Sequence, residues 1–182
     1  MASEFELAEL AARGDVGAFQ AIWNAHRAAI YRFACWMLRD PAAAEDVTQE
    51  CFLVLLQRPG RFDPARASLR TLLLAIARNQ CSIRRRKAQL ETGLADEGAD
   101  LPAPELATAQ LASAECAAIL NAAIANLPPL QREALFLFEY EGLSLEDAAA
   151  VAGTDTGTLK SRLYRGRQRL KRELSWLAKE GF

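Results

Sequence analysis

The chain has 182 residues, of which 51% are hydrophobic and 25% charged, and its formal net charge is −1. This length allows one medium domain or two small ones. No stretch approaches the roughly 18 to 20 apolar residues of a membrane span, and the N-terminus is acidic rather than signal-like. We therefore expect a cytoplasmic protein without direct membrane insertion.

The near-neutral total hides a segregation of charge along the chain. Residues 58–87 contain nine Lys or Arg and a single acid, Asp63. Residues 155–172 contain seven more Lys or Arg, whereas residues 88–131 contain none and carry six acids. Two basic blocks separated by an acidic one predict two surfaces that face nucleic acid, joined by a segment that does not.

Helical periodicity dominates the first half of the chain, and β signals are scarce. Asp15 is expected to cap a helix that stops near Arg39. Asp40-Pro41 then starts a new helix, with proline at its first position, that runs to about Gln57. The pattern predicts four helices ending near position 87, which make one compact domain of residues 1–90.

The last helix of this domain follows a loop from Arg61 to Ala67. Ser68 is expected to cap it, and the helix finishes in the basic run from Arg84 to Lys87. Its apolar positions recur at helical spacing and predict a buried stripe, formed by Leu69, Leu72, Leu73, Ile76, Ala77 and Ile83.

Residues 91–104 carry two glycines, two prolines and four acids with few large apolar groups. This composition is typical of a flexible linker. A second helical domain, residues 105–182, follows. One helix is expected over about 105–126, and Pro128-Pro129 opens the next, which ends at Gly142. Ser144 with Asp147 then predicts a weak capping box for a further helix.

The last two predicted helices have the outline of a helix-turn-helix. A short alanine-rich helix breaks at Gly153, and a longer basic helix follows it. Leu159, Leu163, Gly166 and Leu170 share one face of that helix, where Gly166 permits the close approach of a neighbour. Ser161, Tyr164, Arg165 and Gln168 point away from this face, with Lys160 at the edge. These groups suit phosphates and base edges, although a solvated basic face is the alternative.

Catalytic and metal-binding patterns are missing from the sequence. The four cysteines, Cys35, Cys51, Cys81 and Cys116, include no CxxC pair, and His26 is the only histidine. We interpret the cysteines as small core residues, with a redox switch or a metal site as alternatives. There is no glycine-rich phosphate loop and no Ser/His/Asp set, so we expect no metal, no cofactor and no enzymatic activity.

Several motifs occur in a familiar order. They are G-D-V-G-A-F at residues 14–19, A-E-D-V-T-Q-E-C-F at 44–52, Leu127-Pro128 with Gln131-Arg132-Glu133, and G-T-L-K-S-R-L at 157–163. Together they resemble the extracytoplasmic-function (ECF) group of bacterial sigma factors, the compact type that keeps only the σ2 and σ4 domains. The resemblance covers most of the chain outside the linker.

The resemblance implies a transcription initiation factor that binds the core of bacterial RNA polymerase, through its β and β′ subunits, and promoter DNA. It further implies regulation by an anti-sigma factor. The implied polymerase-binding residues are Glu45, Asp46, Gln49, Glu50 and Phe52. The resemblance also implies that the loop from Arg61 to Ala67 captures a base flipped out of the DNA. The implied −10 residues are Arg61, Phe62, Asp63, Arg66, Ser68, Arg78, Asn79, Arg84, Arg85 and Arg86. The implied −35 residues are Thr158, Lys160, Ser161, Arg162, Tyr164 and Arg165.

Two other functions compete with this interpretation. A stand-alone helix-turn-helix regulator would bind DNA without polymerase, but it needs a dimerisation or ligand domain, and the N-terminal half carries the polymerase-binding signature instead. A protein that only titrates an anti-sigma factor would not need basic patches at both predicted promoter surfaces.

Overall fold

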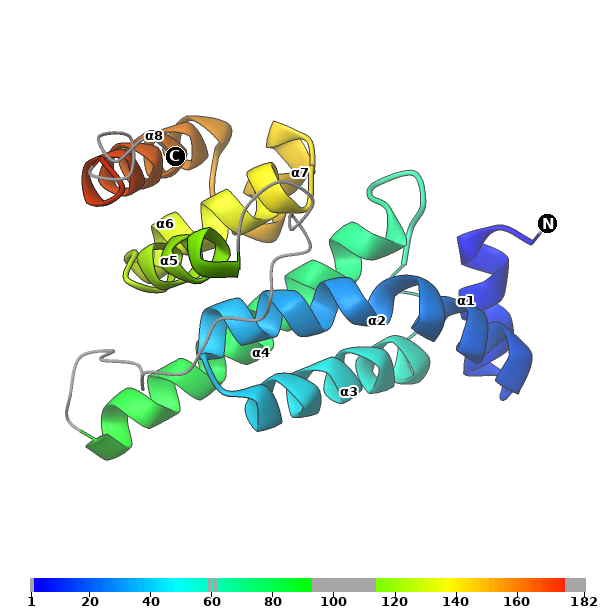
Figure 1. The fold of residues 1–182 in the computed structure, drawn as a ribbon. Coiled ribbons are helices and arrows are strands. Elements are labelled where there is room, and N and C mark those ends of the chain that lie inside the picture. The colour runs from blue at the N-terminus through cyan, green and yellow to red at the C-terminus, as the bar shows by residue number, and fades with distance from the viewer. Residues whose placement is uncertain (1, 59, 61, 93–113, 176–182) are drawn as a thin grey trace. The chain divides into compact units, whose positions relative to one another are not determined.

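The computed structural model of the protein describes residues 2–58, 60, 62–92 and 114–175, and in these ranges it contains helices and no strand (Figure 1). The chain divides into two compact units, Met1–Glu97 and Gly98–Phe182. The prediction of an all-α protein with two small helical domains is confirmed. The predicted linker lies outside the described residues apart from its first two, so its boundaries stay predictions.

The described residues of the N-terminal unit form four helices, α1 (Glu4–Ala12), α2 (Val16–Leu38), α3 (Pro41–Gln57) and α4 (Leu69–Thr92). The long helices α2, α3 and α4 pack against one another, and α1 packs against α2 and α3. Large apolar side chains fill the space between them, because packing the apolar stripes of the helices together removes them from water. The largest fully buried ones in this unit include Ile30, Phe33, Phe52, Leu69 and Leu73.

Each of the four helices begins at a side-chain cap. Ser3 and Glu6 form a reciprocal capping box at α1. Asp15 accepts a hydrogen bond of 2.8 Å from the first turn of α2, Asp40 one of 2.9 Å from α3, and Ser68 one of 3.1 Å from α4. These oxygens satisfy backbone N–H groups that the first turn of a helix leaves unpaired. The predicted caps at Asp15 and Ser68 are therefore confirmed, as is the helix start predicted at Asp40-Pro41.

Helix α4 departs from the prediction in two ways. It does not end at the basic run but continues past Lys87 to Thr92, because no glycine or proline stops it earlier. Ile83, predicted to be buried, is exposed, whereas Leu74 and Cys81 are buried. Two residues past Cys81 correspond to about 200° around a helix, so Ile83 lies on the opposite side from the core.

The C-terminal unit contains α5 (Ala114–Ala125), α6 (Pro129–Leu135), the π-helical turn η2 (Phe136–Tyr140), α7 (Leu145–Val151) and α8 (Thr156–Glu173). The first part of the helix predicted over 105–126 lies outside the described residues. The helix predicted from Pro129 is present, but it finishes in a π turn in which the N–H of Glu141 donates to the carbonyl of Phe136 at 2.9 Å. Gly142 then ends it with a φ of 66°.

The connection between α7 and α8 is the predicted tight turn. Gly153 adopts a φ of 60°, a left-handed conformation that glycine tolerates without strain. Ser144 caps α7 by accepting from the N–H of Asp147 at 3.0 Å. The predicted capping box is half formed, because the Asp147 carboxylate accepts from the Ser144 hydroxyl instead of its N–H. Asp155 caps α8.

Candidate nucleic-acid and protein interfaces

One face of α8 packs inside its own unit. Leu159 and Leu163 are buried, and so is Gly166. A Cβ atom added to Gly166 would lie 3.0 Å from Cδ1 of Leu135 on α6, so glycine is what permits this close approach. These contacts fix which side of α8 turns outward, and they confirm the predicted packing face.

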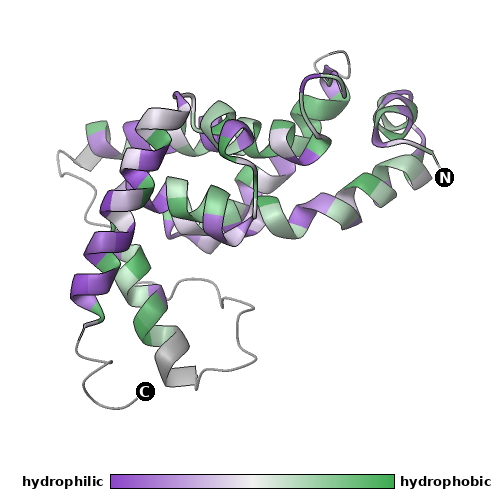
Figure 2. Ribbon diagram, turned by 90° about the horizontal axis from the view of Figure 1, so that it is seen from above, coloured by the Kyte–Doolittle hydropathy of each residue, from purple (hydrophilic) through white to green (hydrophobic). Residues whose placement is uncertain are grey.

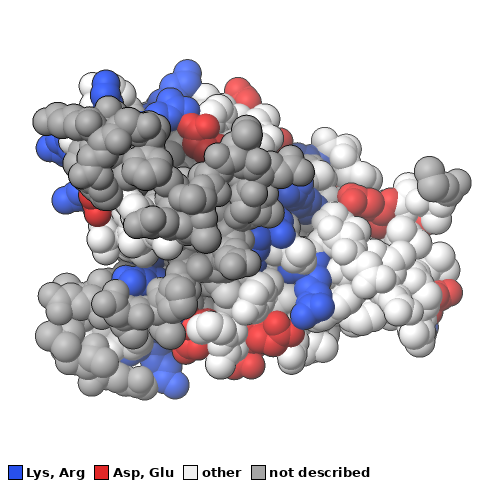
Figure 3. All heavy atoms as spheres, in the orientation of Figure 1, with Lys and Arg blue, Asp and Glu red and all other residues white. Residues whose placement is uncertain are grey.

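The opposite face of α8 is exposed and polar. Tyr164 is 64% exposed, and Arg165 donates from Nε to the carbonyl of Ser161 at 3.2 Å. Figure 2 shows the helix that leads to the C-terminus largely in the hydrophilic colour, and Figure 3 shows Lys and Arg on its surface at the upper left. Cations, hydroxyls and an aromatic ring on one helix face suit phosphates and base edges. Four of the predicted −35 residues line one open hollow there: Lys160, Ser161, Tyr164 and Arg165.

The other two predicted −35 residues are engaged within the protein. Thr158 donates its hydroxyl to the carboxylate of Asp155 at 2.6 Å, as part of the α8 cap, and these hydrogen bonds lower the pKa of Asp155. The side chain of Arg162 is only 16% exposed and lies 3.7 Å from the carboxylate of Glu133, which is 2% exposed. Arg162 thus contacts α6 in this structure, and its assignment to the −35 element stays a prediction.

The loop before α4 is ordered by its own residues. Asp63 accepts from the N–H of Ala65 at 3.0 Å through its side chain and from the N–H of Arg66 at 3.0 Å through its carbonyl. Asp63, Arg66 and Ser68 are exposed. Phe62 is not, because it is 4% exposed and packs in the core. Phe62 thus anchors the loop in the core, and its assignment to the −10 element stays a prediction. Arg61 lies outside the described residues.

The predicted −10 residues of α4 differ in accessibility. Asn79 and Arg86 are exposed, and Arg78 and Arg85 are half-buried with further interactions inside the protein. Arg84 donates from Nη1 and Nη2 to the two carboxylate oxygens of Glu50 on α3, at 3.1 and 2.7 Å. This hydrogen bonding raises the pKa of Arg84 above its ordinary value, so its guanidinium stays charged at neutral pH.

The predicted polymerase-binding residues of α3 fall into two groups. Asp46 and Gln49 are exposed, and Glu45 is half-buried with its carboxylate 4.0 Å from Arg27. Phe52 is 2% exposed and lies 4.7 Å, between ring centroids, from Trp23 on α2. Phe52 thus packs in the core between α2 and α3, and its assignment to polymerase binding stays a prediction.

The described cysteines are core residues. Cys35, Cys51 and Cys81 are free thiols and buried. Burial raises the pKa of Cys35 and of Cys51, which keeps both thiols protonated and poorly nucleophilic. Among the residues that the structure describes, no cluster of histidine, cysteine or acidic side chains could hold a metal ion. Within the same ranges, no helix combines the length and apolar character needed to cross a bilayer.

Comparison with known proteins fits these two units. Residues 5–91 match the family model of sigma-70 region 2, and residues 117–170 match that of sigma-70 region 4. The chain is 38% identical over 166 residues to the ECF RNA polymerase sigma factor SigC of Mycobacterium tuberculosis (strain CDC 1551 / Oshkosh), covering 90% of this chain and 87% of SigC. The chain belongs to the ECF group of sigma factors. It is therefore a promoter-directing transcription initiation factor.

Two further relatives support this assignment. This sigma factor is 30% identical over 164 residues to the ECF RNA polymerase sigma factor SigK of Mycobacterium sp. (strain KMS), covering 88% of this chain and 84% of SigK. Its fold matches the sigma factor RpoE in a co-crystal structure with the anti-sigma factor NepR from Bartonella quintana. The TM-score is 0.73 at 30% identity, over 88% of this chain and 98% of RpoE.

Sequence reasoning missed two acids that hold α8 in this sigma factor. Glu133 on α6 faces Arg162, and Glu139 in η2 pairs with Arg167. The motif around Gln131 placed Glu133 on a helix but did not indicate which helix it meets. The π turn that presents Glu139 left no recognisable signal in the sequence.

Proposed function

We propose that this sigma factor reads the −35 element with the exposed face of α8. The observation that carries the proposal is that four polar side chains stand opposite the buried leucines of the same helix, which leaves them turned away from the protein. Arg165 and Lys160 supply charge, and Ser161 and Tyr164 supply hydroxyl groups. A recognition helix in the major groove uses such groups for base edges and phosphates.

The polymerase core is proposed to dock on the exposed side of α3. Asp46 and Gln49 lie on this side, with Glu45 at its edge. A carboxylate and an amide suit a basic and polar partner surface, and charge complementarity speeds association and selects the partner. Glu50 contributes less directly, because both of its oxygens already accept from Arg84.

The −10 element is proposed to contact the loop before α4 and the exposed side of α4. The exposed tip of the loop includes Asp63 and Arg66, and α4 adds Asn79 and Arg86. The loop suits capture of an unstacked base, and the arginines suit phosphates. Arg61 belongs to this proposal on the sequence alone.

Family membership supports proposals about regulation and location. The solved relative RpoE is bound to an anti-sigma factor, and we propose that an anti-sigma factor also holds this chain inactive. We propose further that the protein acts in the cytoplasm and without catalytic chemistry of its own. It would contribute to initiation by binding both polymerase and DNA.

A binding experiment separates the α3 and α8 surfaces. The affinity of fluorescently labelled sigma factor for purified core polymerase is measured for wild type, Asp46→Ala/Gln49→Ala, Arg165→Ala and Arg13→Ala. The last variant removes an exposed arginine outside every proposed surface. The α3 variant should lose at least about tenfold in affinity, equivalent to about 1.4 kcal/mol. The other two should bind like wild type. Equal affinity for all four proteins would contradict the proposed docking surface.

A further inference from the structure

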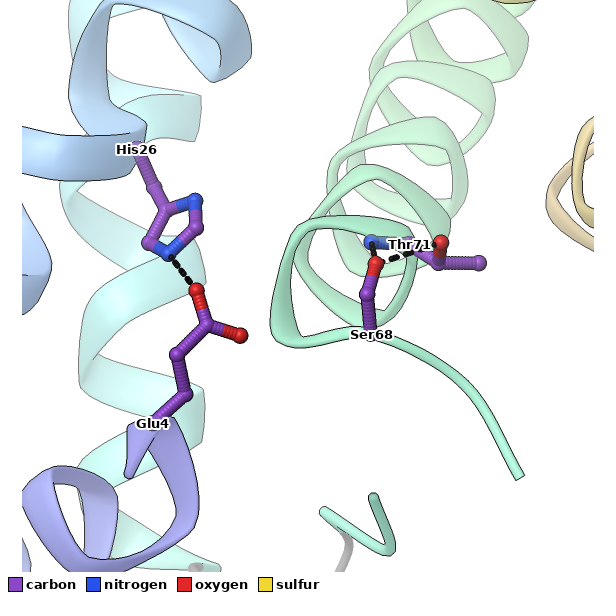
Figure 4. A network of polar contacts seen from close by, with 4 residues as sticks. All are labelled: Glu4, His26, Ser68 and Thr71. Atoms are coloured by element: carbon purple, nitrogen blue, oxygen red, sulfur yellow. Dashed lines mark hydrogen bonds and ion pairs between the residues drawn. The ribbon is translucent and has the colours of Figure 1, made fainter. Parts of the chain in front are cut away.

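Helix α1 has no part in the interfaces proposed above, yet it is attached to the rest of its unit by a buried polar contact. Nε2 of His26 on α2 lies 3.1 Å from Oε1 of Glu4 and donates to it (Figure 4). His26 is buried, whereas Glu4 is exposed. A buried imidazole that loses its partner is left unsatisfied, so this contact holds the first turn of α1 against α2.

The next residue of α1 contacts a different part of the unit. The ring of Phe5 lies 6.2 Å, between centroids, from the ring of Phe62, with the planes tilted by 43°. Consecutive residues on a helix point about 100° apart. One turn of α1 therefore reaches α2 through Glu4 and the loop before α4 through Phe5.

Phe62 is where the loop enters the core. After it, Asp63 closes a turn by accepting from the N–H groups of Ala65 and Arg66. The loop ends at Ser68, whose hydroxyl lies 2.9 Å from that of Thr71 and caps α4 (Figure 4). The exposed tip is thus held at both ends, at Phe62 by α1 and at Ser68 by α4.

We propose that α1 holds the loop before α4 in position for the −10 element. Phe5 is the positioning residue, and it acts on DNA binding through Phe62. The inference rests on the proposed −10 role of the loop. Phe5 itself touches no DNA in this arrangement. It limits the positions that Phe62 and the turn at Asp63 can adopt, so the loop meets an unstacked base without first losing conformational freedom.

The test compares holoenzymes assembled with wild type, Phe5→Ala, Phe5→Leu and Leu10→Ala. Leu10 is an exposed apolar residue on the same helix and serves as the matched control. Two probes are used: a single-stranded non-template oligonucleotide carrying the −10 sequence of a promoter that this sigma factor transcribes, and the −35 duplex of the same promoter. Affinity for core polymerase is measured in parallel.

This role of α1 predicts a selective defect in binding of the −10 strand. Phe5→Ala should bind the −10 strand about tenfold more weakly, as expected for an aromatic contact worth about 1.4 kcal/mol. Its affinities for the −35 duplex and for core polymerase should stay within about twofold of wild type. Phe5→Leu should recover most of the loss, and Leu10→Ala should show none.

Two outcomes would overturn the inference. In the first, Phe5→Ala binds the −10 strand as tightly as wild type. In the second, its affinities for the −10 strand, the −35 duplex and core polymerase all fall together, as they would after a general loss of folding. Glu4→Ala is a second variant, which removes the contact of α1 with His26 and leaves the side chains of Phe5 and Phe62 in place. It should lower the affinity for the −10 strand alone. If wild-type holoenzyme binds no −10 strand, the proposed function fails instead.

Discussion

Glu50 on α3 and Arg84 on α4 form a two-point ion pair, with both carboxylate oxygens accepting from the guanidinium at 2.7 and 3.1 Å. The family resemblance gives these residues to different partners, Glu50 to polymerase and Arg84 to −10 DNA. In the folded protein each is the other's partner. The pair joins the two proposed surfaces of the N-terminal unit and neutralises one of the arginines expected to meet DNA phosphates.

Replacing Glu50 should therefore affect DNA binding. Glu50→Gln frees the Arg84 guanidinium for a phosphate, so the salt dependence of promoter binding should steepen by about one unit. The free energy of unfolding should fall by no more than about 1 kcal/mol, because both side chains are partly exposed. The measurement is promoter affinity against salt concentration. Adding Arg84→Ala should cancel the steeper slope, and an unchanged slope in the single variant would refute the expectation.

The second ion pair, between Glu133 and Arg162, should matter for stability. Arg162→Ala removes a cation that lies 3.7 Å from the buried Glu133 carboxylate, which should lower the free energy of unfolding by about 1–3 kcal/mol. Urea denaturation measures the change. Arg169→Ala removes an exposed arginine from the same helix and should change stability by less than about 0.5 kcal/mol. Equal effects of the two variants would mean that the buried pair does not fix α8.

The close contact at Gly166 predicts that a larger side chain there destabilises the protein. In Gly166→Val, a Cβ atom placed 3.0 Å from Cδ1 of Leu135 is joined by two methyl groups, so the Leu135 side chain or α8 itself must shift. Overpacking of this kind lowers stability by about 1–3 kcal/mol. Gln168→Val places the same side chain on the exposed face of α8 as a control for helix propensity. A thermal midpoint for Gly166→Val at or above that of this control would contradict the contact.

The His26–Glu4 contact predicts a pH dependence. Burial lowers the pKa of His26 below 6.5. The nearby Glu4 raises this pKa but does not cancel the effect of burial, and Arg70 lowers it slightly further. The unfolded chain therefore binds a proton at a pH where the folded protein does not, and acid favours unfolding. The contribution of His26 to stability should be constant above about pH 6.5 and fall below it. His26→Gln should flatten the decline in unfolding free energy between about pH 6.5 and 5, and a slope identical to wild type would contradict this origin.

Much of the fold could be predicted because its signals are local. Asp15, Asp40 and Ser68 each bind N–H groups of the turn that they precede, and the spacing of Leu159, Leu163 and Gly166 alone determines which face of α8 is buried. The all-helical fold and the exposed side of the recognition helix followed from such patterns.

Contacts between elements that lie far apart in the sequence could not be predicted. Phe52 lies in a motif and Phe62 in the loop before α4, and only the packing of Trp23 and Phe5 on them reveals that both are buried. Arg162 could not be told apart from Arg165 by residue type. Glu133, about thirty residues earlier in the chain, makes the difference.

Run-off transcription with purified core polymerase on a library of genomic fragments is the most direct test of the account. Wild type and Arg13→Ala should give core-dependent transcripts whose promoters share −35 and −10 motifs. Asp46→Ala/Gln49→Ala and Arg165→Ala should both lose these transcripts, the first with its core binding and the second with its −35 contact. If wild type gives no transcript yet footprints DNA without polymerase, the protein is a stand-alone regulator and the assignment of its surfaces is wrong.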